Sequence, residues 1–268
     1  MLCVILVGLL VISFYPLYQM LILSLRPIAD INNYISHVQS SAVRFVPVYL
    51  LPRQFSLEQF VAAFDNIFVR TYITSLLHVA AITVLHFPIA FILGFMFAKA
   101  TFKGRDVLFF CFIASMVLPF HVTVVPLNQI LHHLRLLDTH WAVIVPGIFA
   151  PLGVFLLRQF IRQVPDDILE YASIDGAGTM RIIISIILPT IRAGLMVFFL
   201  LTIINQWGAI EPALAFIQDT NLLPTSVWLR GMMLSNPGSI FAPSVLYALP
   251  IFTLIAVLVR INKVDICM

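Results

Sequence analysis

The sequence predicts an all-α membrane protein with six transmembrane helices and one short helix that lies outside the bilayer. Of the 268 residues, 61% are hydrophobic and only 10% are charged, and the mean hydropathy is +1.05. Soluble domains carry about 25% charged residues, so lipid is expected to be the main solvent of this chain. Two further observations support the prediction: six long runs contain no Asp, Glu, Lys or Arg, and one acid-rich stretch separates two of these runs.

Each of the six uncharged runs has the length that one membrane crossing needs, which is about 20 apolar residues. The runs predict spans near residues 2–25, 72–97, 107–126, 141–160, 193–210 and 240–260 of a single transmembrane domain, 1–268. Prolines inside several runs are compatible with this prediction because neighbouring helices can satisfy the carbonyls that a proline frees. The first run lacks a basic leader and a small-residue cleavage pattern, so a retained span is expected there rather than a signal peptide.

The distribution of Lys and Arg predicts that both ends of the chain lie in the cytoplasm. With both ends inside, the three cytoplasmic segments hold nine Lys and Arg in 53 residues, whereas the three outer segments hold six in 71. Cytoplasmic loops near membrane helices carry such an excess of basic residues. The net charge of +3 is otherwise scattered along the chain, so no nucleic-acid partner is expected.

Two outer segments are expected to contain short amphipathic helices. In FSLEQFVAAF, residues 55–64, Ser56 can cap a helix whose apolar residues recur on one face, and PLNQILHHLRLLDTH, residues 126–140, shows a similar pattern. The segment 211–240 contains several prolines and is expected to be an irregular loop.

The acid-rich stretch is PDDILEYASIDGAG, residues 165–178. One acidic residue at the centre of a membrane helix costs about 2.5 to 3.5 kcal/mol, so its four acids must lie in water or against another protein. Pro165 suits the first helical position, and Gly176 and Gly178 can end the helix. The local pattern predicts a short helix over 165–176, with Thr179 capping a second helix that returns towards the bilayer.

The same stretch carries a spaced signature. Glu170, Tyr171 and Ala172 are followed after three residues by Gly176 and after nine more by IILP at 186–189. This resembles the E-A-A-x3-G-x9-I-x-L-P signature of the permease subunits of bacterial ABC importers, with Tyr171 in place of the usual Ala. The resemblance covers about residues 55–260 and extends to the carbohydrate-uptake branch, the relatives of the smaller maltose permease subunit, through FSLEQF, TSL at 74–76, LPFHVTVVPL at 118–127 and QW at 206–207. The tail INKVDICM departs from that branch.

The resemblance implies a type I ABC importer permease: a transport subunit of the inner membrane, without a catalytic site of its own, that translocates a sugar or oligosaccharide. It implies a second permease subunit, two cytosolic ATPase subunits that bind ATP and Mg, and an extracytoplasmic solute-binding protein. The helix at 165–176 would be the cytoplasmic coupling helix that docks on the ATPase. The residues implied in docking are Asp166, Glu170, Tyr171, Ala172, Asp175 and Gly176.

Other polar residues have more than one interpretation. Asn205, Gln206 and Trp207 could line a sugar pathway, or the two amides could bond between helices. Gln218 and Asp219, in the outer loop 211–230, are candidate contacts for the binding protein.

The histidines and cysteines indicate no metal site or disulfide. His78 and His86 could serve a proton path, although packing or a polar contact is favoured. His132, His133 and His140 could be metal ligands, although surface positions are favoured. The three cysteines are far apart and are expected to be packing residues.

Three alternatives to a sugar permease remain. An ion-coupled secondary transporter would be expected to show internal repeats and acids within the spans, and the sequence shows neither. A membrane enzyme would need a catalytic constellation, and none is found. An ABC permease for a non-sugar solute such as glycerol phosphate fits the resemblance as well as a sugar permease does.

Overall fold

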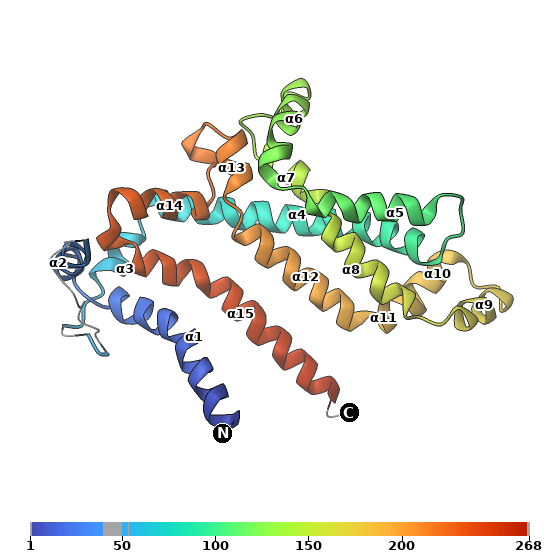
Figure 1. The fold of residues 1–268 in the computed structure, drawn as a ribbon, viewed down its shortest axis with the longest axis horizontal. Coiled ribbons are helices and arrows are strands. Elements are labelled where there is room, and N and C mark those ends of the chain that lie inside the picture. The colour runs from blue at the N-terminus through green and yellow to red at the C-terminus, as the bar shows by residue number, and fades with distance from the viewer. Residues whose placement is uncertain (1, 40–49, 53, 267–268) are drawn as a thin grey trace. The chain divides into compact units, whose positions relative to one another are not determined.

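The computed structural model describes residues 2–39, 50–52 and 54–266, and these residues form helices and connections without a strand (Figure 1). They divide into two compact units. Unit 1 comprises the described parts of Met1–Thr74 and Leu223–Ala256, and unit 2 comprises those of Ser75–Leu222 and Val257–Met268.

Unit 1 contains the first and the last helices of the chain, except for the final turns of the last helix. Its elements are α1 (Leu2–Ser24), α2 (Ile28–Gln39), α3 (Glu58–Ala63), the start of α4 (Asn66–Lys99), α14 (Thr225–Ser235), η4 (Pro237–Ser239) and most of α15 (Phe241–Ile266).

Unit 2 contains the rest of α4 and the middle of the chain. Its other elements are α5 (Arg105–Ala114), η1 (Ser115–Val117), α6 (Phe120–His133), α7 (Trp141–Ile148), α8 (Pro151–Arg162), α9 (Asp166–Ile174), α10 (Thr179–Ile182), η2 (Ile183–Ile187), α11 (Leu188–Thr190), α12 (Arg192–Trp207), α13 (Glu211–Phe216) and η3 (Thr220–Leu222).

Four helices in the described ranges are long and apolar enough to cross a membrane: α1, α4, α7 continued by α8, and α15. Two more segments meet the same test as bent pairs. In one, α5 and η1 turn by 107° into α6, and in the other the α10–α11 segment turns by 79° into α12. Counting each bent pair as one crossing gives six spans, so the predicted class of six-span all-α membrane protein is confirmed.

The third span is bent, whereas the sequence predicts one continuous helix there. The span was expected over 107–126, and the structure has a helical segment from Arg105 to Val117 followed by α6 from Phe120. Leu118 and Pro119 are extended, with φ/ψ of −69°/119° and −66°/145°. Pro119 disfavours helical geometry at the residue before it, so the chain turns here and α6 starts in a new direction.

One expectation about the segments predicted to lie outside is wrong, and one helix was not predicted. The segment 211–240 is not an irregular loop, because it forms α13, η3, α14 and η4. The helix α2 was not predicted, although it is held by a short-range ion pair in which Arg26 Nη2 lies 2.7 Å from Asp30 Oδ2. In α3 the helix begins at Glu58, and Ser56 Oγ accepts the Glu58 N–H at 3.2 Å.

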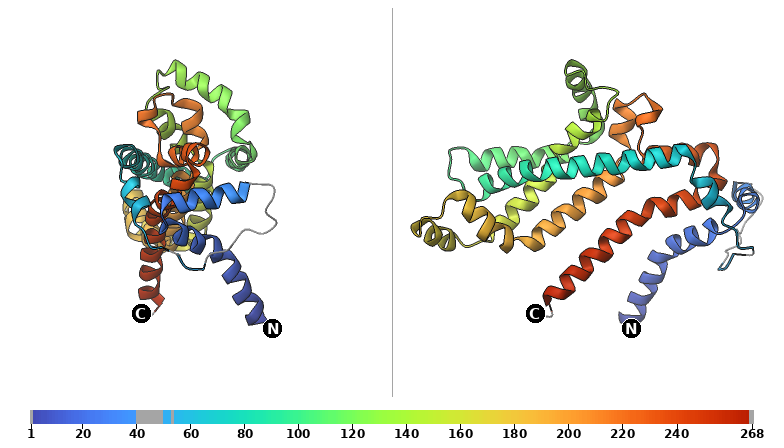
Figure 2. Two further views of the ribbon diagram at one scale, coloured as in Figure 1. Left: turned by 90° about the vertical axis from the view of Figure 1, so that its left-hand side faces the viewer. Right: turned by 180° about the vertical axis from the view of Figure 1, so that it is seen from behind.

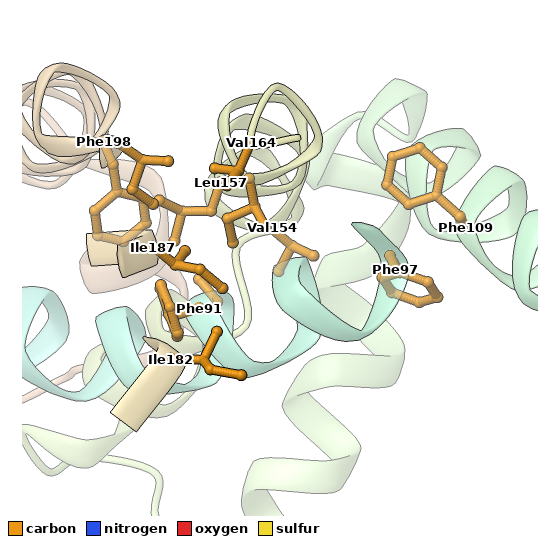
Figure 3. Close-up of a cluster of buried hydrophobic side chains, with 12 residues drawn as sticks. Phe91, Phe97, Phe109, Val154, Leu157, Val164, Ile182, Ile187 and Phe198 are labelled. Atoms are coloured by element: carbon orange, nitrogen blue, oxygen red, sulfur yellow. The ribbon is translucent and has the colours of Figure 1, made fainter. Parts of the chain in front are cut away.

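Unit 2 is organised around one apolar core. Figure 3 shows side chains from α4, α5, α8, η2 and α12 meeting in this core, among them Phe91, Phe109, Leu157, Ile187 and Phe198. A second cluster, formed by Leu131, Ala142 and Phe216, joins α6, α7 and α13. Figures 1 and 2 place α6 and α13 together and α9 at a separate extremity of the same unit.

Candidate functional site

The exposed helix α9 occupies the acid-rich stretch. It runs from Asp166 to Ile174, one residue inside the predicted start and two inside the predicted end. Pro165 is not the first helical residue but the extended N-cap, with φ −60° and ψ 136°. Asp166 and Asp167 occupy the first turn, where negative charge is favourable because the helix dipole is positive at this end.

Gly176 ends α9 in a defined turn. Its φ is +82°, a left-handed conformation that glycine adopts without the penalty of a side chain. The Gly176 N–H donates to Ser173 O at 3.0 Å, and the Ala177 N–H donates to Ala172 O at 2.9 Å. This pair of bonds is the Schellman motif. The chain then enters α10 with Gly178 as the N-cap, so Thr179 is the first residue of that helix and not its cap.

Lys99 attaches the other end of α9 to the rest of unit 2. It is the last residue of α4, and its Nζ donates to Val164 O and, at 2.6 Å, to Asp166 Oδ1. The Lys99 side chain is only 9% exposed, whereas that of Asp166 is 74% exposed. A buried ammonium therefore fixes the start of α9 while the carboxylate that it binds remains accessible.

The two sides of α9 have different surroundings. Leu169 and Ala172 pack against the core of unit 2, so Ala172 lies on the inner side of the helix. Tyr171 and Ile174 are 69% and 79% exposed, and Glu170 next to Tyr171 is also exposed. Sequence reasoning missed Ile174, although its position three residues after Tyr171 could have placed it on the outer side.

A cleft of about 650 Å³ lies beside α9. Its walls come from the end of α4, the connection to α5, and α9 itself, and they include Lys99, Arg105, Asp166 and Glu170. Glu170 has no ion-pair partner among the described residues. The site thus presents an unpaired acid and exposed apolar side chains on a helix that is fixed at both ends, which is an arrangement suited to docking another protein.

A different part of unit 2 fixes the loop that carries Gln218 and Asp219. Asp138 Oδ1 accepts the backbone N–H groups of Gln218 and Asp219 at 2.8 and 2.7 Å, and the Asp138 N–H donates to Phe216 O at 2.9 Å. The Gln218 side chain is exposed, whereas Asp219 Oδ1 accepts two bonds from Asn221. The structure therefore leaves Gln218 freer than Asp219 to contact a partner.

Of the three pathway candidates, the structure brings two together. Asn205 and Gln206 line a cavity of about 270 Å³ between α4, α8 and α12, whereas Trp207 is buried and does not line it. His86 also lines the cavity: its Nδ1–H donates to Ile148 O at 2.5 Å and its ring stacks on Phe198.

Gly153 makes this arrangement possible. A Cβ on Gly153 would lie 2.2 Å from His86 Nε2 and 2.6 Å from the Phe198 ring, so no larger residue fits.

The remaining histidines do not form a metal centre within the described ranges. His78 Nε2 and His140 Nδ1 are 3.0 Å apart, so His140 pairs with a residue within α4 and not with His132 and His133, which are exposed. No group of three or more His, Cys, Asp or Glu comes together among the residues that the structure describes. The interpretation of His78 and His86 as polar contacts is confirmed.

The bent and straight spans, together with the short exposed helix α9, have the architecture of a type I importer permease. Comparison with known proteins agrees. Residues 86–264 match the family described as the binding-protein-dependent transport system inner membrane component, and the chain belongs to this family. The family does not favour the ion-coupled secondary transporter that the sequence left open.

Several relatives and one solved structure support this assignment. The chain is 26% identical over 235 residues to the sn-glycerol-3-phosphate transport system permease protein UgpE of Shigella flexneri, covering 83% of this chain and 84% of the relative. It is 25% identical over 248 residues to the arabinooligosaccharides transport system permease protein AraQ of Halalkalibacterium halodurans, covering 91% and 85%. A bacterial ABC transporter involved in the import of the acidic polysaccharide alginate shares the fold, with a TM-score of 0.78, 19% identity, and 96% and 94% of the two chains covered.

Proposed function

We propose that this chain is one permease subunit of an ATP-driven importer of a sugar or oligosaccharide. In this proposal it pairs with a second permease subunit, receives its solute from an extracytoplasmic binding protein, and docks on one of two cytosolic ATPase subunits. The relatives that carry arabinooligosaccharides and glycerol phosphate in their names support this class of function. ATP and Mg would bind to the ATPase subunits, and this chain would hold no cofactor and catalyse no reaction of its own.

The observation that carries the proposal is the geometry of α9. A nine-residue helix is too short to be stable alone, yet the Lys99 bonds at its start and the Schellman turn at its end hold it in place. Glu170 and Tyr171 then face outward as fixed contact groups. The helix α9 and the residues that hold its two ends belong to the same unit. A partner that moves α9 would therefore also move α4.

The same placement supports an orientation. If α9 meets a cytosolic ATPase, the basic loops on either side of it are cytoplasmic, in agreement with the excess of Lys and Arg there. Both termini would then lie in the cytoplasm, and the loop with Gln218 and Asp219 would face the binding protein.

The test is a charge reversal, Glu170→Lys, measured by recovery of the ATPase with tagged permease and by solute uptake. Loss of a close charged contact costs about 2 to 5 kcal/mol, roughly 30-fold to several thousand-fold in affinity. We expect normal membrane insertion, a strong loss of ATPase recovery, and loss of uptake.

Gln163→Lys is the matched control because Gln163 is exposed and lies just before α9, outside the helix. Unchanged ATPase recovery and uptake in Glu170→Lys would refute the docking role of α9.

A further inference from the structure

The cavity between α4, α8 and α12 has the size of a site for one small ring. Its volume is about 270 Å³. Pockets for drug-sized ligands occupy about 300 to 1,000 Å³, so this one can hold a single ring of a longer solute but not several.

One wall of the cavity carries uncharged hydrogen-bonding groups. Thr202, Asn205 and Gln206 come from one face of α12, because residues three and four apart on a helix are neighbours. Asn205 Nδ2–H donates to Leu201 O at 2.9 Å, which leaves Asn205 Oδ1 as an acceptor. The side chains of Thr202 and Gln206 have no partner within the described ranges, so they can exchange hydrogen bonds with a ligand.

Apart from His86, the rest of the lining is mostly apolar. It includes Met116 from η1 and Leu152 and Leu156 from α8. A sugar ring combines a rim of hydroxyl groups with faces of C–H groups, so it can meet a polar wall on one side and an apolar wall on the other. A free ion or a purely apolar molecule would leave one of the two walls unmatched.

The lining of the cavity favours neutral solutes over anionic ones. None of the residues that line the cavity, all of which are described, is Lys, Arg, Asp or Glu. Phosphate and carboxylate groups are recognised in proteins by Arg and Lys, and a desolvated anion without such a partner is strongly disfavoured. The lining therefore differs from what glycerol phosphate or an acidic sugar would require.

We infer that this cavity, lined by Thr202, Asn205 and Gln206, binds one uncharged sugar unit of the transported solute. The inference rests on the proposed function and narrows its substrate class to neutral oligosaccharides. It also assigns a solute contact to this subunit itself, in addition to any contact made by the partner permease.

The test is protection of an introduced cysteine in the complete importer, reconstituted in proteoliposomes with its binding protein. Thr202→Cys is made in a background in which the three native cysteines are serine, and its maleimide labelling rate is measured with arabinotriose, maltotriose, glycerol 3-phosphate or an alginate trisaccharide. Ile204→Cys is the control, because Ile204 is exposed on the same helix but does not line the cavity. Uptake of each solute is measured in the same vesicles.

We expect a transported neutral sugar to slow labelling of Thr202→Cys roughly tenfold at about ten times its Kd, and to leave Ile204→Cys unchanged. The two anionic solutes should protect neither position. Gln206→Leu, which replaces the amide with an apolar side chain of similar size, should raise the KM for uptake by about three- to tenfold through loss of a hydrogen bond.

Uptake of a neutral sugar without protection of Thr202→Cys would overturn the inference and leave the proposed function intact. Protection by glycerol 3-phosphate or by the alginate trisaccharide would overturn the neutral class. Absence of both uptake and protection for every solute would overturn the inference, and the proposed function would then be judged by the separate Glu170→Lys docking assay.

Discussion

Lys99→Met removes the bonds that attach the start of α9 to the end of α4. Met keeps much of the length and apolar volume of the Lys side chain, which is 9% exposed, but it cannot donate to Val164 O or Asp166 Oδ1. We expect α9 to become only partly ordered, because an isolated helix of nine residues is marginally stable in water.

The magnitude follows from the exposure of the two partners. A hydrogen bond to a charged group contributes about 1.5 to 3 kcal/mol, but an ion pair with an exposed carboxylate contributes only about 0.2 to 1 kcal/mol. Asp166 is 74% exposed, so most of the stabilisation comes from the ammonium bond to the carbonyl of the buried Val164. We expect a loss of about 2 kcal/mol in the ordering of α9, equivalent to roughly 30-fold in its opening equilibrium.

Hydrogen exchange of the backbone of residues 165–177 measures this opening directly, and ATPase recovery measures its consequence for docking. Lys103→Met is the matched control, since Lys103 is an exposed lysine in the same connection and forms no ion pair among the described residues. Asp166→Asn should have a smaller effect because it retains the bond from Lys99 to Val164. Equal exchange rates in Lys99→Met, Lys103→Met and the wild type would refute the reasoning.

Three further substitutions test the packing at Gly153, the backbone conformation at Gly176 and the hydrogen bonds made by Asp138. Gly153→Ala should lower the thermal midpoint of the detergent-solubilised chain by the equivalent of about 1 to 3 kcal/mol through overpacking, whereas Gly231→Ala, with open space at its Cβ position, should not. Gly176→Ala should speed hydrogen exchange at the end of α9, since a left-handed conformation costs a side chain about 1 to 2 kcal/mol, and Gly178→Ala, with φ −68°, should leave it unchanged. Asp138→Ala should speed proteolysis of the loop after α13, because two backbone N–H groups lose their acceptor.

The fold class could be predicted from the sequence because helices that cross lipid require long uncharged runs. The helix α9 could be predicted because its four acids cannot lie in lipid. Pro119 marks the bend in the third span, but the sequence does not tell how far the chain turns there, because an intramembrane proline can either kink a helix or end it. The cavity was only partly predictable. Asn205 and Gln206 could be proposed from their chemistry, but Trp207 faces elsewhere.

Two features of the structure could not be predicted from the sequence, because each depends on segments that are far apart in the chain and close together in space. Lys99 and Asp166 are separated by 67 positions, and no local pattern indicates that they meet. The sequence around Gly153 does not indicate that the ring of His86 packs against this residue.

The helix α4 connects α9 to the cavity and contacts α8 on the way. From His86 at the cavity to Lys99 at α9, α4 covers about 20 Å at the helical rise of 1.5 Å per residue. Between these points a Cβ on Gly94 would lie 3.1 Å from the backbone nitrogen of Arg158, and Arg158 Nε donates to Phe97 O at 3.1 Å. Close-packed interiors have low compressibility and transmit strain. A displacement of α9 that pulls on Lys99 is therefore expected to move α4 and α8 together, and thereby to change the walls of the cavity.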